Sequence, residues 1–189
     1  MRKITNELFY QGSLKKYGLS VKALHWNSKE SQQIRFKTIL NLIDEDISTL
    51  SIADAGCGFG DFYLYLKEKP LSYIGLDSME QMCKEARSRT GCEVLHVNIL
   101  RDELPRADYY ICSGAMNILS RFDTYLFIRR CVEHSKRGFV FNILHGEDDS
   151  MLYNYFQIDE IRSFAKKLDL TCKIVTGYME RDMSVGFYR

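Results

Sequence analysis

A glycine-rich octapeptide, DAGCGFGD, at positions 54–61 limits the possible folds of this chain more than any other part of its sequence. It directly follows an apolar segment at 51–55 that predicts a strand, and it precedes a helical pattern with Phe62, Tyr65 and Leu66. Glycine permits a tight turn and, because it has no Cβ, lets a ligand approach bare backbone. A strand, such a turn and a helix in this order are the context of a nucleotide-binding loop. The octapeptide therefore predicts an α/β fold with a ligand site at this turn.

Strand and helix patterns alternate along the rest of the chain. Short strands are predicted at 51–55, 72–76, 93–97, 108–112 and 139–144, and helices from 62, from 78, at 122–135 and at 158–168. The last two strands, 170–176 and 183–188, are separated by a turn around Gly177 instead of a helix. We therefore expect a Rossmann-like, seven-stranded, mostly parallel sheet with an antiparallel last strand and helices on both faces.

The first 45 residues predict an N-terminal helical cap ahead of the α/β core at 46–189. One helix contains Tyr10, Leu14 and Tyr17. A second helix starts at Asn27, with Glu30 as the partner in a capping box. Its apolar stripe is continued by Gln32 and Gln33, which predicts either a helix end over a polar cavity or an ordinary frayed end. A further capping box is predicted for Ser78 and Gln81.

Length and composition indicate one globular domain spanning residues 1–189. The chain is 46% hydrophobic and 27% charged, as in ordinary globular proteins. It has no apolar run near the roughly 20 residues that span a bilayer, and no secretory signal opens it. We therefore expect a cytoplasmic protein without a membrane partner. A net charge of +1 makes nucleic acid an unlikely partner.

The six cysteines contain no C-x-x-C pair. This spacing argues against a zinc ribbon and against the cysteine cluster of radical chemistry, and we expect no metal site. A domain of this size does not need disulfides, so the cysteines are predicted to be free, mostly buried thiols.

Polar residues end the predicted strands that follow the octapeptide. Asp77 ends the second strand, Asn98 the third, and Ser113 the fourth. Open α/β sheets bind ligands at the carboxyl ends of their strands, where a carboxylate can accept both hydroxyls of a ribose and an amide can bond an adenine edge. The local alternatives are that Asp77 caps its following helix and that Asn98 is a turn residue. Their coincidence at successive strand ends favours the ligand site.

These motifs resemble those of the class I S-adenosylmethionine (SAM)-dependent methyltransferases. The resemblance rests on 54–60 for the first motif, 73–77 for the second, Asn98, and 107–113 for the fourth strand, together with the terminal hairpin. It implies SAM as cofactor and S-adenosylhomocysteine (SAH) as product. Asp54 would lie near the cofactor's amino group, Asp77 would hold the ribose, and Asn98 the adenine.

The segment ahead of the octapeptide, 17–36, resembles that of a bacterial subgroup with this fold, which supplies no substrate. Arg35 is predicted to meet the methionine carboxylate bidentately. Trp26 is either a partner of the sulfonium or a core side chain. The cofactor-binding residues predicted in all are Arg35, Asp54, Ala55, Gly56, Cys57, Gly58, Asp77, Ser78, Asn98, Ile99 and Ser113.

Methyl transfer needs little covalent help from a protein, because the sulfonium is already an activated donor. A base is needed only if the acceptor must lose a proton, and the candidates are His145, Tyr153 and Tyr155. The base-methylating signature of the family, Asn or Asp followed by Pro-Pro-Tyr, is replaced by SGAMN at 113–117.

We therefore expect methylation of a small-molecule acceptor on oxygen or nitrogen by direct displacement. Stretches 10–36 and 145–157 should line its aromatic pocket. The alternatives are an RNA or protein methyltransferase, a non-catalytic SAM-binding protein, and an NAD-dependent dehydrogenase. The last is disfavoured because the loop is G-x-G-x-G and no second substrate domain is present.

Overall fold

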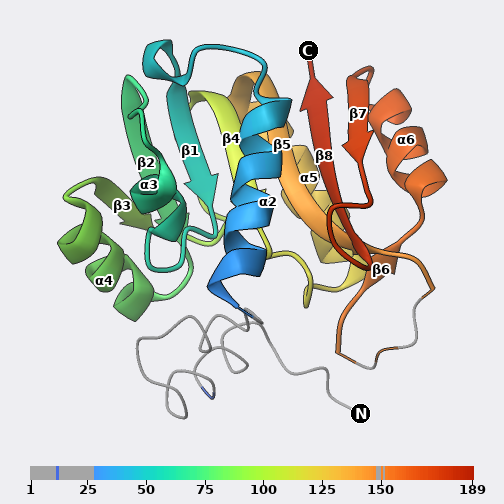
Figure 1. Cartoon of the computed structure of the whole chain (residues 1–189), viewed down its shortest axis with the longest axis horizontal. Helices are drawn as coiled ribbons and strands as arrows, with labels where there is room; N and C mark the ends of the chain where they lie inside the picture. The colour runs from blue at the N-terminus through green and yellow to red at the C-terminus, as the bar shows by residue number, and fades with distance from the viewer. Residues whose placement is uncertain (1–11, 13–27, 148–149, 151) are drawn as a thin grey trace.

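The computed structural model of the chain describes residues 12, 28–147, 150 and 152–189. Its strands are β1 (Ser51–Ala55), β2 (Ser72–Asp77), β3 (Glu93–His96), β4 (Ala107–Ser113), β5 (Ser135–His145), β6 (Tyr155–Phe156), β7 (Thr171–Val175) and β8 (Asp182–Tyr188). Its helices are α2 (Lys29–Leu42), α3 (Asp61–Tyr65), α4 (Glu80–Thr90), α5 (Arg121–His134) and α6 (Ile158–Lys167), with a short 3₁₀ turn at Ile47–Thr49. Figure 1 shows these elements arranged about one central sheet.

Seven of these strands lie in the order β3-β2-β1-β4-β5-β8-β7. The first five are parallel to one another, and β8 runs antiparallel to both β5 and β7. The predicted sheet, including its one reversed strand, is therefore confirmed. The sequence analysis did not predict β6, a two-residue strand that pairs with the end of β5.

Strand β5 begins at Ser135, earlier than the predicted 139. Its first residues include the exposed pair Lys136 and Arg137, so the apolar run in the sequence begins only after them. Ser135 nonetheless pairs with Ala107, and a register shift follows before Gly138 pairs with Tyr109. The start of β5 is therefore set by pairing with β4 and not by its own side chains.

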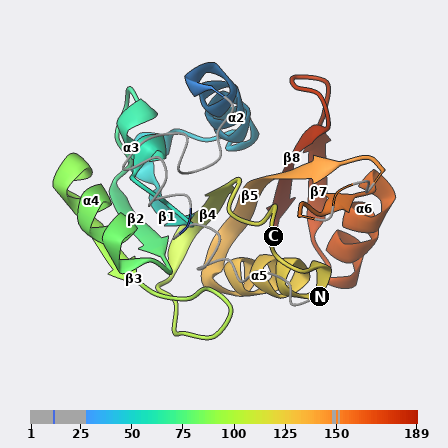
Figure 2. The same ribbon diagram turned by 90° about the horizontal axis from the view of Figure 1, so that it is seen from below.

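The two faces of the sheet carry separate apolar clusters. Ile52, Ile111 and Val140 pack on one face with residues of α2 and α3. Ala53, Tyr110 and Phe139, each one position away, pack on the other face with residues of α5 and α6. Figure 2 separates α2 and α3 from α5 across the sheet. Because side chains alternate along a strand, each central strand is covered on both faces.

Helix α2 begins one residue later than predicted. Its N-cap is Ser28, and the capping box joins Ser28 to Ser31, so the predicted pairing with Glu30 is wrong. Serine at the third helical position reaches back to the Ser28 N–H, as glutamate does in the more usual box. The predicted helix containing Tyr10, Leu14 and Tyr17, like Trp26 and Asn27, lies outside the described residues.

Gln32 excludes the frayed-end alternative for the start of α2. It is buried, while Gln33 is exposed. Its Nε2 donates to Asp61 Oδ2 at the start of α3, over 3.2 Å. This turn of α2 is therefore fixed to the neighbouring helix and is not a frayed end.

Candidate functional site

A polar row lies at the carboxyl edge of the sheet, on the face covered by α2. Asp54 follows Ile52 by two positions, Ser113 follows Ile111, and Asn142 follows Val140. Since side chains repeat every second residue along a strand, the apolar residues and the polar ones share this face. The apolar layer beneath α2 thus gives way to polar groups where the parallel strands end.

Strand β1 is at the centre of this edge, between β2 and β4. The chain runs outward from β1 to β2 and β3 and then returns to β4 on the other side, so the strand order reverses beside β1. Ligands of open α/β sheets bind at such a point. The arrow of β1 points downward in Figure 1, so Figure 2, which is seen from below, looks onto this edge of the sheet.

The glycine loop follows β1 at this point. Gly56, Gly58 and Gly60 have φ values of +80°, +55° and +76°. The N–H groups of Gly56 and Cys57 both donate to the Leu76 carbonyl, over 2.7 and 3.1 Å. A Cβ on Gly56 would lie 2.4 Å from the Ala115 Cβ. Glycine at this position therefore serves both the left-handed backbone and the close approach of the loop that follows β4.

The Cys57 side chain is buried over β2, beside Gly75, where an added Cβ would lie 2.9 Å from its Sγ. Burial raises the pKa of the Cys57 thiol well above its usual range. Any contact of Cys57 with a ligand is therefore expected through its backbone.

Asp77 is buried at the end of β2 and joins two loops. Its Oδ2 accepts from the Gly58 N–H over 3.0 Å, and its Oδ1 accepts from the Met79 N–H over 2.9 Å. Burial is the main cause that raises its pKa to about 6. A carboxylate oxygen has two lone pairs, so each oxygen retains acceptor capacity beyond these backbone bonds.

Helix α4 begins after Met79, and no side chain caps it. The predicted capping box of Ser78 with Gln81 is therefore wrong. Asp77 instead bonds the Met79 N–H, and the Ser78 carbonyl lies 3.0 Å from Nε2 of His96. The Asp77 carboxylate therefore supports the start of the following helix, which was the local alternative. It also remains a candidate for binding a ligand.

Asp54 is a second buried carboxylate on this face. It accepts from the Tyr73 hydroxyl over 2.6 Å. Burial raises its pKa to about 7, and repulsion from Asp77 acts in the same direction. Among the described residues, no lysine or arginine forms an ion pair with either carboxylate. Tyr73 was missed as a site residue, since one tyrosine in a short apolar strand gives no distinct signal.

Asn98 lies in the turn after β3. Its Oδ1 accepts from the Leu100 N–H over 2.9 Å, while its own N–H donates to Asp102. The turn role therefore uses the side-chain oxygen and leaves the Nδ2 group without a hydrogen bond among the described residues. Ile99 is buried in the core on the α5 face.

Arg35 lies on α2 and binds β8. Its Nε donates to Asp182 Oδ2 over 2.6 Å, and Nη2 bonds the same oxygen. Asp182 was missed because its partner is 147 positions away in the sequence. Contact of Arg35 with a cofactor carboxylate stays a prediction, and so does the binding role of each residue in the predicted set.

Of the three candidate bases, His145 is the last residue of β5, one position earlier than expected, and Tyr153 and Tyr155 follow that strand. His145 is half-buried, and its N–H donates to the Arg181 carbonyl. Burial raises the pKa of Tyr153, so its phenolate is disfavoured at neutral pH. The Tyr155 ring lies 4.1 Å from the Arg181 guanidinium carbon. A catalytic role for any of them stays a prediction.

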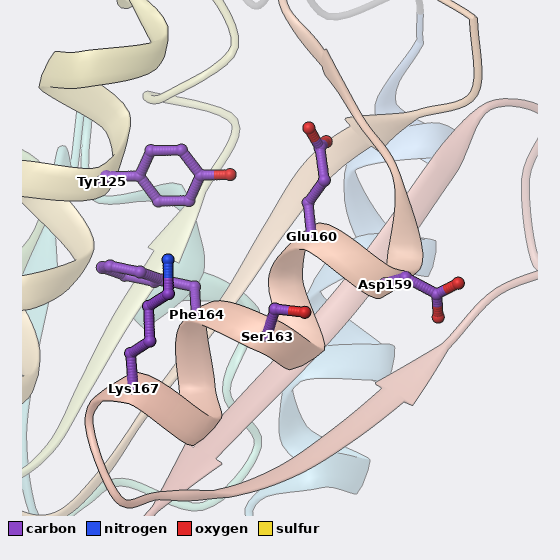
Figure 3. A pocket seen from close by; sticks show the side chains of 6 residues that line it. All are labelled: Tyr125, Asp159, Glu160, Ser163, Phe164 and Lys167. Atoms are coloured by element: carbon purple, nitrogen blue, oxygen red, sulfur yellow. The ribbon is translucent and has the colours of Figure 1, made fainter.

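A separate groove of about 620 Å³ lies between α5 and α6 and is lined by Tyr125, Asp159, Glu160, Ser163, Phe164 and Lys167 (Figure 3). It belongs to the face opposite α2, whereas the glycine loop and the two carboxylates lie on the α2 side. No predicted site residue lines it.

Residues 52–138 match the family described as "Methyltransferase domain". No curated protein sequence matches the chain. Among the described residues, no helix combines the length and the apolar character needed to cross a bilayer.

The fold is similar to several solved structures, methyltransferases among them. Magnesium protoporphyrin IX methyltransferase from Synechocystis PCC 6803, with bound SAM, has a TM-score of 0.73 at 12% identity, covering 98% of this chain and 97% of that one. An amino pentose methyltransferase of calicheamicin biosynthesis from Micromonospora echinaspora, also with bound SAM, has a TM-score of 0.68 at 14% identity, covering 89% and 95%. The pyocyanin biosynthetic protein PhzM has a TM-score of 0.72 at 15% identity, covering 95% and 61%.

The match spans the strand, glycine loop and carboxylates that form the polar edge, and the sheet has the mostly parallel strands and the one reversed strand that were expected. Residues 52–138 thus match a methyltransferase domain, and the chain as a whole has the fold of solved SAM-dependent methyltransferases.

Proposed function

We propose that the chain binds SAM at the edge of β1, β2 and β4 and transfers its methyl group to oxygen or nitrogen of a small-molecule acceptor. The observation that carries this proposal is the pair of buried carboxylates, Asp54 and Asp77, beside the glycine loop. Both have raised pKa values, of about 7 and about 6, and no lysine or arginine among the described residues pairs with them. A buried carboxylate without a cation is costly unless a ligand supplies one.

The chemistry of SAM fits these residues. SAM carries an ammonium and a sulfonium, so it brings positive charge to a site that holds two carboxylates. Its ribose brings two hydroxyl donors, and Asp77 has acceptor capacity left after its two backbone bonds. The Asn98 amide remains as a donor for an adenine edge.

When bound, SAM supplies an activated methyl carbon: the acceptor's lone pair forms the new bond, and the carbon–sulfur electron pair stays on sulfur. The chain's own part is to hold the two reactants in line and to exclude water. The glycine loop and Asp77 hold one side of the site, and the loop after β4 closes against Gly56. The acceptor's proton leaves to solvent or to a base, for which we propose His145.

Three observations support a small-molecule acceptor. The near-zero net charge gives no field that would gather nucleic acid. The aligned methyltransferases include one that acts on magnesium protoporphyrin IX and one that acts on an amino pentose. The sequence from 113 to 117 lacks the base-methylating signature.

Calorimetric titration with SAM, SAH and NAD tests the cofactor. We expect both sulfur compounds to bind and NAD not to bind. In Asp77→Asn the affinity should fall by about tenfold or more, because hydrogen bonds to a charged group are lost. Asp159→Asn, which alters an exposed carboxylate on α6, is the matched control. Binding of NAD in preference to SAM, or no binding of either sulfur compound, would refute the proposal.

A further inference from the structure

A row of polar side chains, half-buried at Ser113 and buried at the other two positions, crosses three strands beside the proposed cofactor site. Ser113 on β4, Asn142 on β5 and Ser184 on β8 are register partners across the sheet. Ser113 Oγ donates to Asn142 Oδ1 over 2.8 Å, and Asn142 Nδ2 donates to Ser184 Oγ over 2.5 Å. Asn142 and Ser184 are 1% and 0% exposed. Apolar residues of similar size would suit this interior, so the row calls for a role that needs hydrogen bonds.

The row continues to a buried ion pair. Ser184 Oγ lies 2.8 Å from the hydroxyl of Tyr178, in the turn between β7 and β8. The Tyr178 hydroxyl donates to Asp182 Oδ1, and the other oxygen of Asp182 binds Arg35. Asp182 is fully buried. The complete hydrogen-bond chain runs from the cofactor edge to α2 through the side chains of Ser113, Asn142, Ser184, Tyr178, Asp182 and Arg35.

The ion pair between Arg35 and Asp182 fixes which group donates and which accepts in every bond of this hydrogen-bond chain. Asp182, paired with Arg35, is a carboxylate and can only accept, so the Tyr178 hydroxyl must donate to it. Ser184 therefore donates to the Tyr178 oxygen and accepts from the Asn142 amide. The Asn142 carbonyl oxygen then faces Ser113 and accepts a hydrogen bond from its hydroxyl.

Ser113 is left with only lone pairs for a ligand. Its single proton is used inside the chain, so its Oγ can accept a hydrogen bond at the cofactor edge but cannot donate one. Ser113 also lies on the same face as Asp54, since β4 continues two residues beyond Ile111, the register partner of Asp54. Both groups are acceptors on one face of adjacent strands, which favours a ligand group that only donates.

We infer that the hydrogen-bonded side chains from Asp182 to Asn142 hold the Ser113 hydroxyl as a hydrogen-bond acceptor for the α-ammonium of the cofactor. This inference rests on the proposed function. An ammonium has three donors and no acceptor, whereas the cofactor's carboxylate and ring nitrogens would need a donor. Tyr178, Ser184 and Asn142 are thus positioning residues that act through Ser113.

Removal of the Tyr178 hydroxyl tests the direction of the chain. In Tyr178→Phe, Ser184 loses its acceptor and can donate to the Asn142 carbonyl after the amide turns over. The amide group then faces Ser113, which becomes a donor at the cofactor edge. The readout is the ratio of the affinities for SAH and for its deamino analogue, which lacks only the α-amino group, measured by calorimetry.

We expect wild type to prefer SAH over the deamino analogue, and Tyr178→Phe to lose about tenfold of that preference. Ser184→Ala, which removes the acceptor of the Asn142 amide, should lose it as well. Tyr188→Phe is the matched control, because the Tyr188 hydroxyl donates to the Leu42 carbonyl away from this chain.

A ratio of affinities separates positioning from general damage to the fold, which would weaken both ligands equally. Equal weakening, or an unchanged ratio in both variants, would refute the inference. Equal binding of both ligands to wild type would refute it too, while leaving the proposed cofactor intact. Failure of wild type to bind SAH at all would instead refute the proposed function.

Discussion

Asp54 and Asp77 are single residues whose charged forms are disfavoured by burial until a cationic ligand binds. Each is buried, and each accepts hydrogen bonds that favour its charged form, from the Tyr73 hydroxyl in one case and from two backbone N–H groups in the other. Burial outweighs these bonds, because the pKa values remain raised, to about 7 and about 6. The site therefore holds two carboxyl groups whose ionisation a cationic ligand would favour.

This arrangement predicts that stability falls as pH rises. Between the ordinary carboxyl pKa near 4 and the raised values, the folded chain binds more protons than the unfolded chain, so the free energy of unfolding decreases with pH. We expect urea unfolding at about pH 8 to give a value on the order of 2 kcal/mol below that at about pH 5.5. Asp54→Asn should flatten the difference. An Asp54→Asn variant with the wild-type pH dependence would contradict this assignment.

Among the elements, the loop after β4 is held from two sides. Gly56 approaches it from the end of β1. From the segment before β6, the Asn154 N–H donates to the Asn117 carbonyl over 2.9 Å, and its side-chain amide bonds the Leu119 carbonyl. The two-residue β6 thus has a structural consequence beyond its length, since it places Asn154 beside this loop.

Gly56→Ala should therefore destabilise the chain more than alanine at another left-handed glycine. Gly91 provides the comparison, because it has a φ of +69° and open space around an added Cβ, whereas at Gly56 the added Cβ meets Ala115 at 2.4 Å. Both variants carry about 1 to 2 kcal/mol of left-handed strain, and only Gly56→Ala also displaces a loop. Thermal unfolding and SAH titration measure the difference. Equal losses in both variants would show that the contact with Ala115 is unimportant.

At the scale of the whole molecule, the site depends on the order of the strands. Because β1 lies between β2 and β4, the glycine loop, Asp77 and Ser113 come from three adjacent strands. A ligand at this edge contacts loops that lie far apart in the sequence, and it binds only the folded chain. Binding must therefore stabilise the whole fold.

We expect SAH at about 100 times its Kd to raise the melting temperature by roughly 5 to 10 °C. This range follows from about 2.7 kcal/mol of binding free energy in a domain of this size. Scanning calorimetry measures the shift, with NAD at the same concentration as the control. A similar shift with NAD would show that the site does not select the sulfur compound.

Sequence patterns predicted the succession of the main strands and helices along the chain, the glycine loop and the reversed last pair. These features follow from local signals, namely side-chain periodicity, glycine in a turn, and a connection around Gly177 too short for a helix. Asp77 and Ser113 were identified because each ends a predicted strand, and Asp54 because it opens the glycine-rich octapeptide that resembles the family's first motif. Their roles in binding remain predictions.

The contacts between residues that are distant in the sequence arise only in the folded chain. Ser28 caps α2 with Ser31, Tyr73 supports Asp54, and Asn142 joins Ser113 to Ser184. The single polar residue in the apolar run 139–144 was the one sequence signal for the row across the sheet. Its partners on other strands could not be identified, because hydrogen bonds between strands are set by register, and register arises only when distant segments pack together.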